Sequence, residues 1–79
     1  MVPVKRVQTG MRIEQSMLKV LKGLAEYLDI SLGELIEGIV LHAFGERLPF
    51  GEPTTSVIRQ LSSVYGLDLG PEDSHHLVE

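Results

Sequence analysis

Residues 5–13 have the sequence KRVQTGMRI, in which apolar and polar side chains alternate. One side of this stretch holds Val7, Thr9, Met11 and Ile13. Alternation with a period of two residues is typical of a strand with one buried face. The sequence therefore predicts a strand that begins near residue 6, and the rest of the predicted fold depends on how this strand finds a partner.

Two amphipathic helices are predicted after the strand. Apolar residues recur at helical spacing over residues 17–28, which predicts the first helix. Gly23 lies inside this helix at a cost of roughly 1 kcal/mol relative to alanine, and it marks either a close packing contact or a tolerated glycine. Ser31 and Glu34 then form the S-x-x-E pattern of a capping box, which predicts a second helix over residues 32–44.

The second predicted helix is apolar on more than one side, so it needs cover on two sides. The first helix would pack against one apolar side, and a second copy of the chain is the simplest partner for the other side. A chain of 79 residues is marginally stable alone, and this one has no cysteine to form a disulfide, although 43% of its residues are hydrophobic. These properties together predict self-association.

The C-terminal third of the chain adds one more helix. Thr54 or Thr55 is expected to cap a short helix near residues 55–65, and Gly66 suits its end. The chain thus divides into a folded unit over residues 1–45, a connector over 46–53 with two prolines, a helical segment over 54–67 and an acidic tail over 68–79.

A single strand requires a partner, because its backbone N–H and C=O groups must be hydrogen-bonded. The sequence offers no second strand of comparable quality. The simplest arrangement is pairing with the same strand of a second copy, antiparallel about a two-fold axis. A two-stranded ribbon of this kind fits the major groove of DNA.

Charge is unevenly distributed along the chain. The net charge is −4, yet residues 1–13 hold Lys5, Arg6 and Arg12 and no acid, whereas residues 14–79 hold four bases and all eleven acids. Local charge sets the field that a phosphate backbone meets. The basic end is therefore where the sequence predicts a nucleic-acid site.

Several classes of protein are excluded by what the sequence lacks. No apolar run approaches the roughly 18–20 residues that cross a bilayer, and no signal peptide is recognisable, so we expect a cytoplasmic protein without a membrane partner. No nucleophile–base set, phosphate-binding loop or dinucleotide fingerprint occurs, and His75 and His76 lack a third metal ligand at useful spacing. The sequence predicts no enzyme, no cofactor and no metal site.

The order and spacing of these elements resemble those of the ribbon-helix-helix DNA-binding proteins. The resemblance covers residues 6–44 and lies in the strand end Met11-Arg12-Ile13-Glu14, the apolar pattern over residues 17–28 and the segment over residues 30–36. It implies a mainly α fold with one short strand, as an obligate homodimer with an intermolecular two-stranded antiparallel ribbon. The short third helix near residues 55–65 lies outside the resemblance.

The resemblance also implies a set of DNA contacts. Three outward strand residues would enter the major groove as base contacts: Gln8, Gly10 and Arg12. Phosphate contacts would come from the basic residues Lys5 and Arg6 and from the start of the second helix at Ser31, Leu32 and Gly33. Arginine and glutamine suit guanine and adenine respectively, whereas Gly10 has no side chain with which to read a base.

The leading prediction is a sequence-specific DNA-binding protein, a small transcriptional regulator or repressor that binds the major groove with its dimeric ribbon. One alternative is an antitoxin-like module that holds a protein partner through residues 46–79, since these residues exceed the core fold. Another is a ribbon-helix-helix scaffold that has lost DNA binding, which Gly10 and the acidic pI of about 5.3 support. The sequence leaves open whether dimers associate further on DNA.

Overall fold

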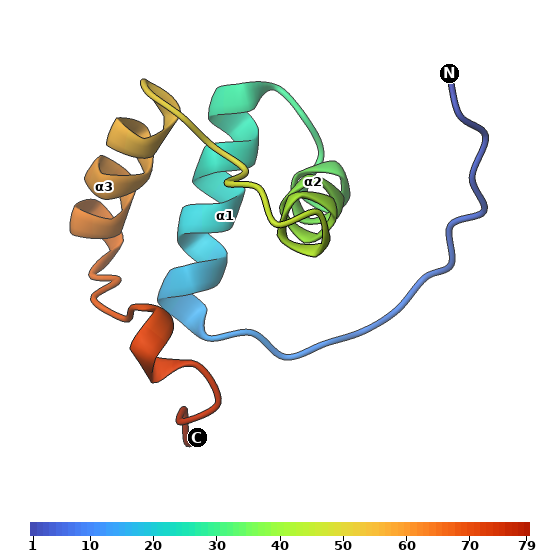
Figure 1. The fold of residues 1–79 in the computed structure, drawn as a ribbon. Coiled ribbons are helices and arrows are strands. Elements are labelled where there is room, and N and C mark those ends of the chain that lie inside the picture. The colour runs from blue at the N-terminus through green and yellow to red at the C-terminus, as the bar shows by residue number, and fades with distance from the viewer.

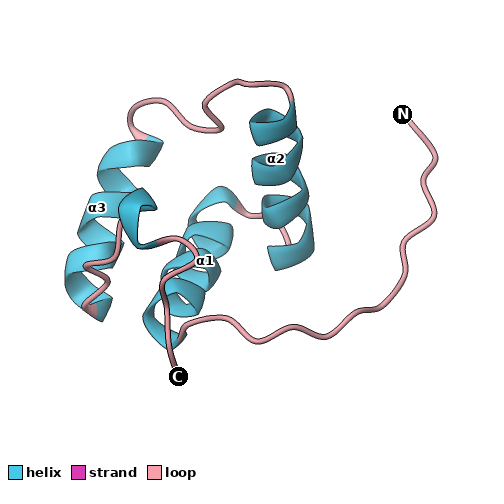
Figure 2. Cartoon of the chain, turned by 60° about the horizontal axis from the view of Figure 1, so that its bottom comes forward, coloured by secondary structure: helices cyan, strands magenta, loops and turns pink.

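The computed structural model describes residues 1–79 and contains helices but no strand (Figure 1). The elements are α1 over Gln15–Leu28, α2 over Leu32–Phe44, α3 over Thr54–Tyr65 and a short 3₁₀-helix, η1, over Pro71–Asp73. Helix α1 lies between the other two long helices and packs against both. Figure 2 shows the same arrangement from a second direction.

Helix α1 begins with a cap that the sequence pattern did not single out. The Glu14 carboxylate accepts hydrogen bonds from the backbone N–H groups of Ser16 (3.0 Å) and Met17 (2.9 Å) and from the Ser16 hydroxyl. These bonds, led by the one from the Ser16 hydroxyl, hold the pKa of Glu14 below its usual value. The helix ends at Asp29, whose φ of 57° places it in the left-handed region and allows the turn into α2.

The predicted capping box of α2 is confirmed. The Ser31 hydroxyl oxygen accepts a hydrogen bond from the Glu34 backbone N–H (3.1 Å), and the Glu34 carboxylate accepts one from the Ser31 backbone N–H (3.2 Å). The helix covers Leu32–Phe44, as predicted, and Gly45 follows as its C-cap.

Helix α3 explains the glycine inside α1. A Cβ atom built on Gly23 would lie 3.0 Å from Cδ2 of Leu61 in α3, so Gly23 marks a close packing contact. The predicted third helix is present, but the predicted threonine cap is wrong. Pro53 occupies the cap position without a side-chain hydrogen bond, and the Thr55 hydroxyl donates to Glu52 instead.

The buried core is small and involves all three long helices. The buried residues are Val20, Leu24 and Ala25 of α1 and Leu35 of α2. Partly buried side chains that surround this cluster come from α2, from the connector and from α3: Ile39, Phe50, Val57, Ile58 and Leu61. The segment after α2 is therefore part of the folded body rather than an appendage to it.

The predicted strand, and with it the ribbon-helix-helix fold class, is wrong. Residues 1–13, which we call the N-terminal arm, form no regular element, and no backbone group of theirs bonds to another backbone group. Alternation lets a segment lie extended with one apolar side, but a strand exists only where a second segment pairs with it. No part of the chain does so, and Val7 and Met11 remain 75% and 64% exposed instead of facing the helices.

Candidate nucleic-acid interface

The N-terminal arm runs past α2 on the side away from α1 (Figures 1 and 2). It carries Lys5, Arg6 and Arg12 and no acidic residue, so it is the most basic part of an otherwise acidic chain. Because its backbone is extended and its side chains are exposed, these cations can reach a ligand without rearrangement of the helices.

A groove of about 640 Å³ separates the arm from the start of α2. Four of the five residues that were predicted to contact phosphate line this groove: Lys5, Arg6, Ser31 and Gly33. The fifth, Leu32, does not line it. Residues that lie more than twenty positions apart in the sequence are thus brought to one surface, as a shared anion site would require.

The start of α2 has two unbonded donors, and one of them belongs to Gly33, which lines the groove. The backbone N–H groups of Leu32 and Gly33 have no acceptor within the protein. Free N–H groups and the positive end of the helix dipole both favour an anion at this position. No side chain intervenes at Gly33, and the nearest atom to a Cβ built there is the Ser31 hydroxyl oxygen, at 4.0 Å.

The same groove also contains two carboxylates, which sequence reasoning did not include. Arg6 donates two hydrogen bonds of 2.9 Å to Glu37, and Glu34 lines the groove beside it. The hydrogen bond from Arg6 lowers the pKa of Glu37, so this carboxylate is ionised at neutral pH. In the free protein, the Arg6 guanidinium is therefore bound to Glu37, and a phosphate would have to displace this carboxylate.

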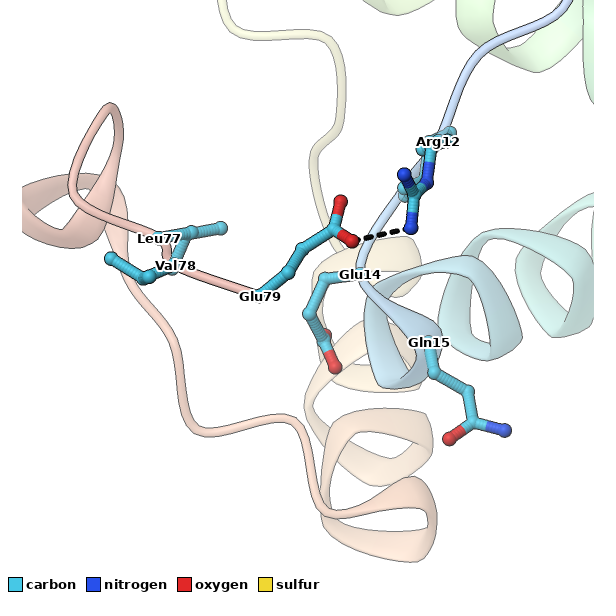
Figure 3. A pocket seen from close by; sticks show the side chains of 7 residues that line it. Arg12, Glu14, Gln15, Leu77, Val78 and Glu79 are labelled. Atoms are coloured by element: carbon cyan, nitrogen blue, oxygen red, sulfur yellow. Dashed lines mark hydrogen bonds and ion pairs between the residues drawn. The ribbon is translucent and has the colours of Figure 1, made fainter.

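The predicted base contacts do not line the groove. Gln8 and Gly10 are exposed on the arm, and a Cβ atom built on Gly10 would meet no other atom within 4 Å. Arg12 lies at a second pocket, where the arm joins α1 and meets the C-terminal residues (Figure 3). There it forms an ion pair with the Glu79 carboxylate, which the sequence pattern had no means of indicating.

The remaining cations and histidines have other surroundings. The Lys19 ammonium lies 5.9 Å from the centre of the Tyr65 ring, so it packs between α1 and α3 rather than beside the arm. His42 forms a hydrogen bond of 2.7 Å with the Gly38 carbonyl inside α2. No group of three or more histidine or acidic side chains is placed to hold a metal ion.

No helix combines the length and apolar character that a membrane span needs. No protein-family model, curated protein or solved structure gave a match to this chain when each was compared with it. The resemblance to ribbon-helix-helix proteins thus receives no support from these comparisons.

Proposed function

We propose that this chain is a small cytoplasmic DNA-binding regulator that contacts the duplex with its N-terminal arm and the start of α2. The observation that carries the proposal is the shared groove, which is lined by the arm cations Lys5 and Arg6 and by Gly33 at the start of α2, whose backbone N–H is free. Cations and helix N-termini are both groups with which proteins hold phosphate oxygens.

The extended form of the arm supports DNA as the ligand over a small anion. Thirteen extended residues span up to about 45 Å, which is longer than one helical turn of B-DNA. Basic arms of this kind enter DNA grooves in several protein classes. Gln8 and Arg12 would then supply base contacts, and Gly10 would let the backbone come close to the groove wall.

The negative charge of residues 14–79 limits DNA contact to the side of the protein that carries the arm. Outside the arm the chain carries four bases against eleven acids, so the helices repel a phosphate backbone and only the arm side attracts it. Glu37 and Glu79 compete with phosphate for Arg6 and Arg12. Both ion pairs are exposed, and exposed pairs exchange partners at little cost.

The alternative of a protein-binding module over residues 46–79 receives less support. Val57, Ile58 and Leu61 of α3 pack against the core cluster, so this segment already has a structural role in its own chain. A partner that held α3 by its apolar side would have to replace α1.

The test is fluorescence anisotropy of a labelled DNA duplex at about 50 mM salt, where phosphate contacts are strong. We expect the full chain to bind, and the double variant Lys5→Gln/Arg6→Gln to bind at least about ten-fold more weakly. The matched control is Lys19→Gln/Lys22→Gln, which removes the same charge from α1 and should change the affinity much less. Equal losses in the two variants, or no binding by the full chain, would refute the proposal.

A second variant tests the competition by Glu37. The substitution Glu37→Gln releases Arg6 without changing the size of the side chain, and we expect it to raise the affinity for the duplex. The control is Glu26→Gln, which removes an exposed acid from α1, away from the groove. An equal rise in both variants would mean that only the net charge of the protein matters.

A further inference from the structure

Helix α2 has two apolar sides, and the chain covers only one of them. Leu35 and Ile39 face α1 and the core. On the opposite side, which we call the outer face, Val40 is 38% exposed, Leu41 69% and Phe44 81%. Side chains spaced three or four residues apart share one side of a helix, so these residues form a continuous apolar surface.

The total exposed area shows how much surface the chain leaves uncovered. It exposes 6808 Å², whereas a compact monomer of 8.7 kDa exposes about 4,700 Å². The excess is about 2,100 Å² and includes the extended arm, whose residues 1–12 are all exposed, as well as the outer face; a stable interface needs about 800 Å² from each partner. Only four of the 79 residues are buried, which is a small core for a chain without disulfides.

We infer that a second copy of this chain covers the outer face of α2. Two observations support a second copy: the large exposed area and the small buried core. Association through this face would bury apolar surface on both chains at once. A two-fold axis requires a patch that is complementary to itself, and an apolar helix face meets this requirement because no charge on it lacks a partner. Its one acidic residue, Glu37, is paired with Arg6 in the DNA-free protein, which is the state in which self-association is tested below.

A groove beside the outer face has room for side chains of the second copy. It measures about 460 Å³, and its apolar lining comes from Val4 of the arm and from Ile36, Val40 and Leu41 of α2, with the charged residues Lys5, Arg6 and Glu37 at its side. Val4 is itself 62% exposed. The apolar surface therefore continues from α2 onto Val4 of the arm.

The geometry of a two-fold pair singles out Val40. Helix α2 has thirteen residues and is about 20 Å long, and the longest contact in an antiparallel α2 pair forms when the two-fold axis lies at the middle of each helix. Val40 is the apolar outer-face residue next to that midpoint. The pair would also bring two basic arms into one particle, a consequence that rests on the proposed function, whereas the interface itself does not.

The first test is sedimentation equilibrium of the full chain between about 1 and 100 µM, a range in which dimers of moderate affinity form. We expect a mass of twice 8.7 kDa at the upper end. A mass of 8.7 kDa throughout would overturn the inference and leave the outer face to the arm or to a different protein. DNA binding by such a monomer would leave the proposed function intact.

The second test uses the absence of native cysteine. In the variant Val40→Cys we expect a disulfide-linked dimer under mild oxidation, because the two thiols meet across the axis. The matched control is Val64→Cys on α3, where the valine is 74% exposed and random collision is therefore easier. Faster cross-linking of the control, or equal rates, would overturn the inference. Neither conservative substitution should prevent folding.

A third variant tests the energy of the contact. Placing a charge in the apolar contact with Phe44→Glu, at the end of α2 that would lie near the start of the partner's α2, should weaken self-association at least about ten-fold, as the loss of an apolar anchor does in other interfaces. The control Val64→Glu adds the same charge at a similarly exposed apolar position and should leave the mass distribution unchanged. An unchanged distribution in both variants would contradict a second copy on the outer face.

Discussion

Replacing Leu35 by alanine should destabilise the chain more than any exposed substitution. Leu35 is 2% exposed and is the one buried residue of α2, where it joins this helix to Leu24 and Ala25 of α1. Truncation of a buried leucine to alanine costs about 2–5 kcal/mol, depending on how far the surroundings relax. The neighbours here are only partly buried and can move inward, so we expect about 2–3 kcal/mol.

This loss is large for so small a protein. Domains are stable by about 0.05–0.15 kcal/mol per residue, which for 79 residues is about 4–12 kcal/mol. Since each kcal/mol shifts the Tm of a domain of this size by about 4–8 °C, the Tm of Leu35→Ala should fall by about 8–24 °C. Helical circular dichroism during thermal and urea unfolding measures both quantities.

The control is the same substitution at Leu48, which is 88% exposed. We expect Leu48→Ala to change the free energy of unfolding by less than about 0.5 kcal/mol. Both variants must be compared at one protein concentration, because self-association makes the Tm concentration-dependent. A loss below about 1 kcal/mol for Leu35→Ala, or equal losses in the two variants, would show that α2 does not pack on α1 through Leu35.

Four further substitutions test local features of the fold. Gly23→Leu should destabilise the chain by about 1–3 kcal/mol, because Leu61 fills the space beside Gly23. Gly38→Ala should stabilise it by up to about 1 kcal/mol, because a Cβ atom at Gly38 would meet nothing within 4 Å. Urea unfolding measures both changes, and a Gly23→Leu protein as stable as the wild type would contradict the contact with Leu61. Ser31→Ala should cost about 1 kcal/mol in the same assay through loss of the α2 cap, and no loss would contradict the capping box. Hydrogen bonding lowers the pKa of Glu14 from its ordinary 4.5, so its contribution to the free energy of unfolding is complete above that pH and is lost as the pH falls through the lower folded value. The stability difference between the wild type and Glu14→Gln should therefore shrink below pH 4.5, and a constant difference would contradict the cap.

The helices could be predicted from the sequence because their signals are local. The apolar spacing over residues 17–28 and the cap formed by Ser31 and Glu34 lie within a few positions of the bonds they make. The role of Gly23 could not be decided in the same way, because the contact that explains it comes from Leu61, thirty-eight positions later. The Glu14 cap was missed because glutamate is not among the usual capping residues.

The strand was predicted wrongly because pairing is not a local property. Alternation over residues 5–13 shows that the segment can lie extended, but not that another segment bonds to it. The charge of the arm was visible in the sequence, whereas the carboxylates beside it were not. Glu37 lies thirty-one positions from Arg6, and Glu79 lies sixty-seven from Arg12, so only the fold could bring them together.

The measurement that tests the central claim most directly is the salt dependence of DNA binding between about 50 and 200 mM. Each phosphate contact changes the slope of log K against log salt by about −0.9, so the three arm cations predict about −2.7 per chain and twice that for a pair of chains. The arm variant with Lys5, Arg6 and Arg12 replaced by glutamine should lose nearly all of this slope. A slope that survives the triple substitution, or no binding at about 50 mM salt, would contradict the claim that the arm holds DNA.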